Sequence, residues 1–425
     1  MNARTPSVLS LVGLLTLAGC TPGGLVRLEG MPEDPPDAPL EHVGGADQPG
    51  EPPLEAVDGV GDLSAPLFAG DEIPTFHLTL SPESMESLHQ AYLDWIYSGI
   101  VFTEYVEGTF EYDGVVYDPV GIRLKGQGSA LDVYDKAAFK VKFNEYVPGA
   151  RFMGLECLTL NNMSYDYSMM HERLAYWIYR EAGVPASRSS HALVTVNGEM
   201  YGLYANVETP DVHMIGRWFE RTDGTLFEGW DVDFTAEYIP YFQLEYGPDD
   251  RDNLWGLAEA LAMPGPQAMV DAEEYIDVSA FLRYWAVGAV VGQFDAYPYS
   301  WPGDDFHVYD DPEAGRLRFI PWGVDETFYY PTNPVDYVYG VLAVRCLELG
   351  TCRQAWEAEV WAVHDLAVSL DWASEFEAVQ AQIAPLVAQD TMKPYSNSDV
   401  AYYQAVMQGM IETRATDLVS LIGPP

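Results

Sequence analysis

The first half of the chain alternates apolar and polar residues in the way that is typical of β-strands. Residues 76–80 and 139–143 alternate with a period of two, so one face of each segment is apolar. Asp113-Gly114 and Asn197-Gly198 are strong turn signals, and each lies between two such segments. We therefore expect hairpins and a further strand in this half, at 109–112 with 115–117, 120–124, and 192–196 with 201–207.

Apolar residues recur at helical spacing mainly in the second half. The first half has two such segments, 82–97 and 167–182, whereas the second half has them at 252–263, 279–293, 353–368, 372–388 and 398–421. One pair of strands interrupts these helices, at 306–309 and 317–321. The pattern predicts an α+β fold with a β-rich lobe at 72–210 and a mainly helical lobe at 211–425.

The N-terminus has the pattern of a secretion signal. Arg4 precedes an apolar run at 8–18, which is too short for a membrane-spanning helix. The run ends in Leu17-Ala18-Gly19-Cys20, which resembles the signal of a bacterial lipoprotein. The resemblance implies that residues 1–20 are a signal peptide and that Cys20 carries a lipid anchor. It places the protein at the bacterial cell envelope, in the outer membrane or at the cell surface. The alternative is an ordinary secretory signal.

Residues 21–70 have the composition of a disordered linker. They are dense in Pro, Gly, Asp and Glu, Arg27 is their only Lys or Arg, and no apolar periodicity survives.

The charge of the whole chain limits its partners. Lys and Arg number 21 against 65 Asp and Glu, which gives a net charge of −44. A surface this acidic repels phosphate backbones and anionic lipids. We therefore expect no nucleic-acid partner and no membrane contact beyond the lipid anchor, whereas basic proteins and divalent cations are favoured.

Four cysteines are present, and no CxxC zinc motif is found among them. Cys346 and Cys352 close a short loop and are candidates for a disulfide in an oxidising compartment. Cys157 lies in an apolar run and is expected to be a buried strand thiol.

Residues 121–129 end a strand in a loop of small residues. Gly126 and Gly128 would let backbone N–H groups approach a phosphate, although most such loops are simple turns. The strand that follows carries Lys140 and Lys142 on one face, which is unexpected in so acidic a chain. A solvated strand face is the competing interpretation.

Carboxylates flank the strand pair of the second half. Asp295 follows an apolar helix, Asp304 and Asp305 precede the first strand, and Asp325 follows the second. Oxygen ligands of this kind suit Mg²⁺ or Ca²⁺. Solvated loops and capped turns are the simpler alternative.

This order of elements is that of the protein kinases, although their tripeptide signatures are absent. The sequence resembles the CotH kinase family, the spore-coat protein H group of atypical kinases. The resemblance covers residues 75–330, continues more weakly to Arg414, and rests on GIRLKGQGS at 121–129, VNGEMYGLYANVE at 196–208 and IPWGVDETF at 320–328. It implies a two-lobed protein-kinase-like fold, ATP with Mg²⁺ or Mn²⁺, and phosphate transfer to Ser or Thr of a protein, which we expect to be basic and Ser-rich.

The resemblance also implies roles for particular residues. Asp295 matches the catalytic aspartate and Asp325 the metal-binding aspartate, and Asp305 is a further residue that can bind metal. The phosphate-binding lysine is Lys140 or Lys142, between which spacing does not decide.

The remaining nucleotide-binding roles fall on glycines and glutamates. Gly126 and Gly128 form the loop over the phosphates, Glu172 is the helical partner of the strand lysine, and Glu208 lies near the expected hinge between the lobes.

The chain departs from the family pattern at two of its acidic positions. The family usually has Asp at the position of Gly323 and Asn at the position of Asp305. Loss of a carboxylate at 323 leaves open a second function, that of a catalytically inactive, kinase-shaped binding or structural protein of an envelope or coat layer. A Ca²⁺-binding adhesion domain is a third possibility, suggested by the acidity and the 28 tyrosines.

Overall fold

Seven strands of the N-terminal half close into a barrel in the order β1-β2-β3-β4-β5-β7-β6, and β1 and β6 pair in parallel to complete it. The computed structural model describes residues 62–126, 128–329 and 337–425, which belong to one compact unit. The barrel strands are β1 (Thr75–Leu80), β2 (Val106–Tyr112), β3 (Val115–Lys125), β4 (Ala138–Lys142), β5 (Cys157–Asn161), β6 (Ser189–Val196) and β7 (Glu199–Val207).

Alternation along the strands fills the barrel with aromatic and branched side chains. Phe139 and Val141 of β4 are fully buried, whereas Lys140 between them lies on the outer face and is half-buried. Inside, the Phe110 ring packs edge-on against Phe143 and Phe152. The expected strands at 115–117 and 120–124 are one continuous strand, β3.

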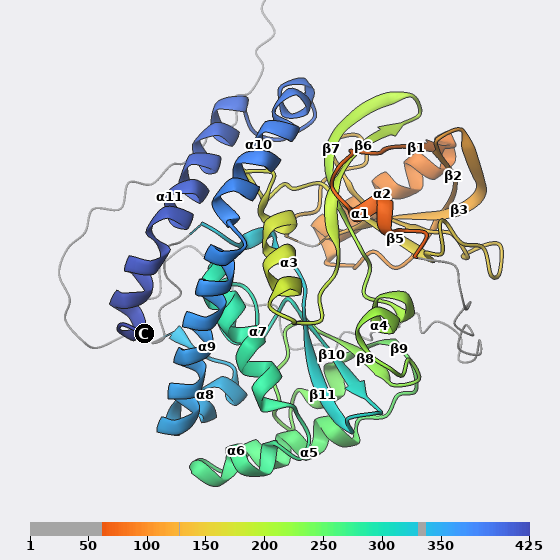
Figure 1. Ribbon diagram of the computed structural model, residues 1–425. Coiled ribbons are helices and arrows are strands. Elements are labelled where there is room, and N and C mark those ends of the chain that lie inside the picture. The colour runs from red at the N-terminus through yellow and green to blue at the C-terminus, as the bar shows by residue number, and fades with distance from the viewer. Residues whose placement is uncertain (1–61, 127, 330–336) are drawn as a thin grey trace, which may run out of the picture. The chain divides into compact units, whose positions relative to one another are not determined.

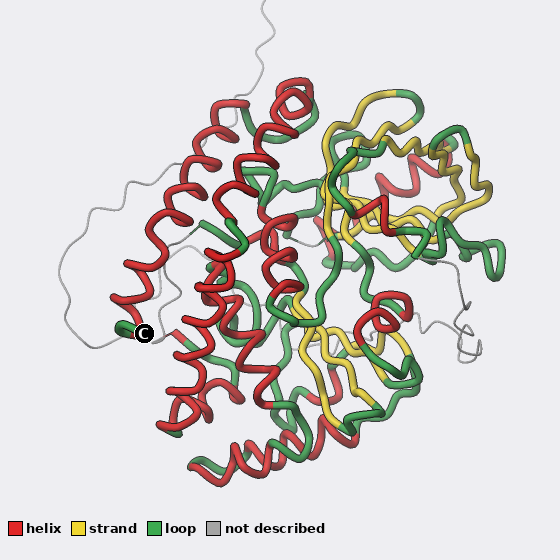
Figure 2. The backbone as a smooth tube through the Cα atoms, in the orientation of Figure 1, coloured by secondary structure: helices red, strands yellow, loops and turns green. Residues whose placement is uncertain are grey.

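A second sheet of four strands lies in the second half, in the order β11-β10-β8-β9. Its strands are β8 (Thr225–Gly229), β9 (Gln243–Tyr246), β10 (Phe306–Asp311) and β11 (Arg316–Pro321). Of these strands, only the β10–β11 hairpin was expected from the sequence. Figure 2 shows the strands in these two separate groups, with most helices to one side.

The helices form the rest of the second half. α7 packs beside α9, and α10 packs beside α11 (Figure 1). The helices are α1 (Ala65–Phe68), α2 (Pro82–Ser98), α3 (His171–Glu181), α4 (Val212–Trp218), α5 (Asp252–Leu261), α6 (Pro266–Ala272), α7 (Val278–Val291), α8 (Val341–Glu348), α9 (Gly350–Ser369), α10 (Trp372–Gln389) and α11 (Asn397–Ile422), with single 3₁₀ turns η1 (Ile239–Tyr241) and η2 (Val324–Glu326). The α+β class expected from the sequence is confirmed. None of the helices in the described ranges combines the length and the apolar character that a membrane span needs.

The start of the described chain packs on the barrel. Residues 65–68 form α1 inside the range expected to be linker, because Leu67 and Phe68 are buried. Arg188 holds the preceding residues through an ion pair of 2.6 Å to Asp62. Cys20, the signal peptide and the linker up to residue 61 lie outside the described residues.

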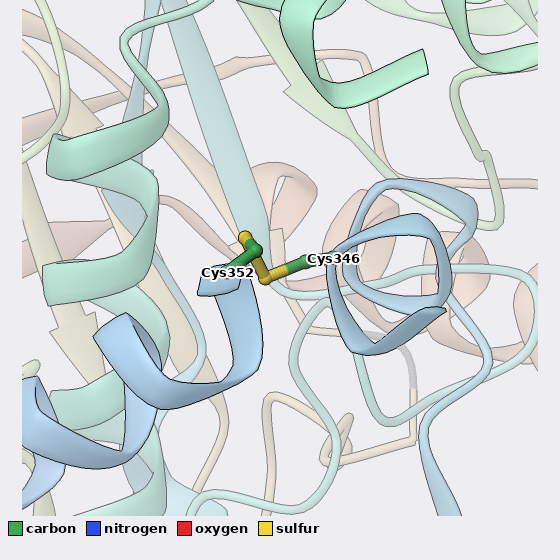
Figure 3. Close-up of a disulfide and its surroundings, with 2 residues drawn as sticks. All are labelled: Cys346 and Cys352. Atoms are coloured by element: carbon green, nitrogen blue, oxygen red, sulfur yellow. A yellow bond between two sulfur atoms is a disulfide. The ribbon is translucent and has the colours of Figure 1, made fainter. Parts of the chain in front are cut away.

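The structure joins Cys346 and Cys352, the pair that the sequence analysis singled out, in a disulfide between α8 and α9 (Figure 3). Cys157 lies on β5 as expected but is half-buried, and burial raises the pKa of its thiol to about 11.

Candidate functional site

The candidate site begins where β3, β5 and α3 meet. Lys125 ends β3, and its Nζ donates a hydrogen bond to Oδ1 of Asn161, which ends β5. The Asn161 amide in turn donates to Oε1 of Glu172, in the first turn of α3. Nζ of Lys125 also lies 5.6 Å from the centre of the Trp322 ring. Asn161 therefore connects the lysine to the glutamate.

Charge couples Lys125 to two carboxylates. Burial, with the neighbouring Asp325, raises the pKa of Glu172 to about 8 although Lys125 opposes the rise. Burial also raises the pKa of Asp325 against the attraction of Lys125. Burial lowers the pKa of Lys125, and both carboxylates oppose that change. The positive charge of one lysine therefore does not neutralise two carboxylates that are buried away from water.

Glu172 retains an unused hydrogen-bonding atom. Its side chain is 1% exposed, and Oε2 is buried without a hydrogen-bond partner among the described residues. A buried carboxylate oxygen without a partner is costly, so it calls for an explanation such as a catalytic role or a bound water or ion.

Asp305 and Gly323 share one space at the other side of the site. Gly323 has a φ of +51°, and a Cβ built on it would overlap the carboxylate of Asp305. The backbone holds the two residues together, because the Trp322 N–H donates to the Asp305 carbonyl over 3.1 Å. The Asp305 carboxylate therefore occupies the space into which a side chain at position 323 would project.

Further carboxylates surround Asp305. Burial and the neighbouring Asp304 raise the pKa of Asp305 well above its usual value, and Asp295 and Asp325 add to the rise. Burial raises the pKa of Asp304 to about 7, and burial with Asp295 raises the pKa of Glu326 to about 7. Asp295 itself lies in the loop after α7, and burial raises its pKa too.

These carboxylates have the chemistry that a divalent cation requires. Their raised pKa values show that their negative charges are poorly compensated. Within the described ranges, however, no three His, Cys, Asp or Glu side chains are arranged to hold a metal ion by themselves. A Mg²⁺ ion commonly takes only one or two carboxylates and completes its shell with phosphate oxygens and water. The residues therefore fit a metal that arrives with a phosphate ligand.

The lysines proposed from the sequence lie elsewhere on the outer face of the barrel. Lys142 forms an ion pair of 3.2 Å with Glu145. Lys140 interacts electrostatically with Glu228 and Glu245 of the second sheet, and burial together with Glu245 raises the pKa of Glu228 to about 8. Neither lysine takes the place beside Glu172 that Lys125 holds. The sequence signal for Lys125 was its position at the strand end, directly before Gly126.

The glycine loop lies near the carboxylates. Gly126 has a φ of +82°, which favours glycine, and a Cβ on Gly128 would lie 3.0 Å from the Tyr165 hydroxyl. Loss of water raises the pKa of Tyr165, and Glu326 and Asp325 contribute to the rise. Tyr165 thus connects the glycine loop to Asp325 and Glu326.

Glu208 belongs to a different cluster. Its carboxylate is buried and paired with Arg188 at 2.7 Å and with Arg217. These contacts hold the segment after β7 against the start of β6, so the structure gives Glu208 a connecting position rather than one beside Lys125.

The sequence of this chain is similar to a kinase family and to two spore coat proteins. The sequence model of the CotH kinase protein family matches residues 122–416. Inner spore coat protein H of Bacillus subtilis (strain 168) is 22% identical over 302 residues, which cover 66% of this chain and 80% of that protein. A second protein of that organism, inner spore coat protein H-like protein, is 34% identical over 77 residues, or 18% of this chain and 24% of its own length.

Among solved structures, the proinflammatory kinase CtkA of Helicobacter pylori matches with 9% identity and a TM-score of 0.29, over 76% of this chain and 95% of that one. The family match covers more than half of the chain, and it includes Lys125, Glu172, Asp295, Asp305 and Asp325. The chain belongs to the CotH kinase protein family.

Proposed function

We propose that this protein is an atypical protein kinase with a two-lobed, protein-kinase-like fold, which transfers a phosphoryl group from ATP to a Ser or Thr hydroxyl of a protein. The observation that carries the proposal is the connected set of Lys125, Asn161 and Glu172, with Asp325 beside it and the glycine loop nearby. Phosphoryl transfer depends on charge compensation and positioning, and this set supplies both.

Each residue of the site has its own role in this function. Lys125 contacts the phosphates, and Glu172 holds it in place through Asn161. Asp325 and Asp305 hold the divalent cation, Mg²⁺ or Mn²⁺, which when bound neutralises phosphate charge. Asp295 orients the acceptor hydroxyl and takes its proton, and the raised pKa of its half-buried carboxyl favours that step.

Four variants test the proposal on the purified protein. Lys125→Met and Asp325→Asn should abolish Mg²⁺-dependent ATP binding in calorimetry, because each removes charge that the triphosphate or its metal requires. Lys142→Met is the matched control and should bind ATP normally, since its ion pair is with Glu145. Asp295→Asn should bind ATP but transfer radiolabelled phosphate about 10²–10⁴-fold more slowly. Normal ATP binding by Lys125→Met would contradict the assignment.

The second candidate function is an inactive, kinase-shaped structural protein, and Gly323 is the observation that favours it. The wild-type protein distinguishes the two. Transfer of phosphate to itself or to basic Ser-rich acceptors supports the kinase. ATP binding without any transfer, with Mg²⁺ and with Mn²⁺, supports the inactive form.

We also propose that the protein acts at the bacterial cell envelope as a lipoprotein anchored through Cys20, on a basic protein substrate attracted by its acidic surface. Cys20→Ser should release the processed protein from the membrane fraction. A processed variant that still sediments with membranes would refute the anchor.

A further inference from the structure

His171 connects the helix that carries Glu172 to the turn that carries Asp325. Its side chain is 1% exposed, and Nδ1 lies 2.7 Å from the backbone carbonyl oxygen of Asp325 in η2. A carbonyl oxygen only accepts hydrogen bonds, so Nδ1 carries the proton and donates. Asp166 makes two contacts with His171. Its Oδ1 lies 3.4 Å from Nδ1 of the ring, and its Oδ2 accepts a hydrogen bond of 2.7 Å from the His171 backbone N–H.

The surroundings fix the imidazole in this orientation. The rings of Tyr329 and Phe328 lie 4.7 Å and 5.8 Å from its centre. The Tyr329 hydroxyl accepts a hydrogen bond of 3.1 Å from the N–H of Tyr167, on the segment that leads into α3. The ring is therefore held between the α3 N-terminus and the residues that follow Asp325.

Within the described ranges, the other hydrogen bonds of the turn do not involve the Asp325 carbonyl. The Thr327 hydroxyl donates to the carbonyl of Val324 over 2.8 Å, and the Phe328 N–H donates to the carbonyl of Val291 over 2.8 Å. These bonds hold the two sides of the turn. In the described part of the chain, the bond from His171 is the one that fixes the Asp325 carbonyl.

We propose that His171 is a positioning residue for Asp325, and that the first turn of α3 thereby sets the distance between Lys125 and the metal-binding carboxylate. His171 and Glu172 are adjacent in sequence. Glu172 fixes Lys125 through Asn161, whereas His171 fixes the Asp325 backbone directly. Lys125 and the Asp325 backbone are thus both held by the first turn of α3. The inference rests on the proposed kinase function for its catalytic meaning, but the structural link is independent of it.

The test compares three variants of the full chain. His171→Leu removes the donor, and His171→Asn keeps a side-chain N–H near the position of Nδ1. His191→Leu is the matched control, because His191 is also 1% exposed and its Nε2 lies 2.7 Å from a backbone carbonyl, that of Met169. Hydrogen–deuterium exchange of residues 322–329 and Mg²⁺–ATP affinity are measured for each.

His171→Leu should speed exchange in residues 322–329 and weaken Mg²⁺–ATP binding about 10- to 100-fold, as loss of an outer-shell partner of a metal ligand does. His171→Asn should restore most of both, and His191→Leu should lose stability without changing either. Unchanged exchange in both His171 variants, or an equal change in His191→Leu, would overturn the inference. Should wild type bind no Mg²⁺–ATP, the kinase proposal fails, while the exchange data still decide the role of His171.

Discussion

The shared space of Gly323 and Asp305 is the clearest steric constraint at the scale of single residues. The left-handed backbone at 323 suits glycine, and the missing side chain leaves room for the carboxylate of Asp305. Asp305 also has a positive φ, of 53°, which is uncommon for a residue other than glycine. Both residues therefore have a positive φ, and the carboxylate of Asp305 fits into the space beside Gly323.

Gly323→Ala should separate backbone strain from displacement of Asp305. Gly315→Ala is the control, because Gly315 has a similar φ of +62° and open space around its Cβ position. Both variants should lose about 1–2 kcal/mol of unfolding free energy from left-handed strain. Only Gly323→Ala should also weaken Mg²⁺–ATP binding, since it pushes the Asp305 carboxylate aside. Urea unfolding and calorimetry measure the two effects, and equal metal-nucleotide affinity in both variants would argue against the role of Asp305.

The sequence led to part of the candidate site. Glu172 and Asp325 were named from the resemblance to the CotH kinase family, and the structure brings both next to one lysine. That lysine is Lys125, whereas the sequence favoured β4. Alternation along a strand tells which residues share a face, but not which part of a closed barrel faces the second sheet. The connection through Asn161 depends on that three-dimensional arrangement and left no pattern in the sequence.

At the scale of elements, a buried ion pair ties the barrel to the C-terminal helices. Nζ of Lys136 lies 2.6 Å from Oδ2 of Asp390, and both side chains are almost fully buried. Asp390 ends α10 and also accepts a hydrogen bond of 2.9 Å from the N–H of Leu203 in β7. Gly202 leaves the space for this approach, because a Cβ there would overlap the carboxylate.

Lys136→Met should cost about 3–5 kcal/mol of unfolding free energy, because it leaves the Asp390 charge buried without its cationic partner. The double variant Lys136→Met/Asp390→Asn should recover much of the loss, since the amide oxygen keeps the bond from Leu203 without a charge. Chemical denaturation of the wild type, the two single variants Lys136→Met and Asp390→Asn, and the double variant gives the loss and the coupling. Additive losses in the double variant would show that the pair is not coupled as the structure indicates.

Long periodic elements were predictable and short ones were not. The strands β1 and β4, the helix α2 and the four long helices of the second half lie close to their expected positions. The elements that were missed, α1, α4, α6, α8, β8 and β9, are four to eight residues long. Segments of this length do not complete a recognisable period, and tertiary packing rather than local pattern stabilises them. The start of α3 at His171 instead of Tyr167 has a local cause, because Met169 has a φ of +61°.

At the scale of the whole molecule, buried carboxylates make stability depend on pH. Burial raises the pKa of Glu172 and Glu228 to about 8 and that of Asp304 to about 7. The folded protein therefore holds more protons than the unfolded chain above the ordinary carboxyl pKa. This contribution to stability is complete below that ordinary value and is lost as the pH rises through the raised pKa values.

Without divalent metal, the melting temperature should fall between about pH 5 and pH 8, which is the window set by pKa values of about 7 and 8. Asp305→Asn and Glu228→Gln should each flatten the dependence, because each removes a carboxyl that resists ionisation. Calorimetric melting curves at low and high salt separate these groups from surface repulsion, which salt screens. A melting temperature that rises over this window would contradict the expected direction.

The pairing of Asp305 with Gly323 also changes how members of this family should be compared. Relative to the pattern that the resemblance implies, this chain has glycine instead of an acidic residue at 323 and an acidic residue instead of asparagine at 305. In space these two alignment columns are one position, since the carboxylate of Asp305 fills the volume that a side chain at 323 would occupy. Surveys that sort relatives into active and inactive groups should therefore score the two columns jointly, and relatives with glycine at the second column should be searched for a carboxylate at the first.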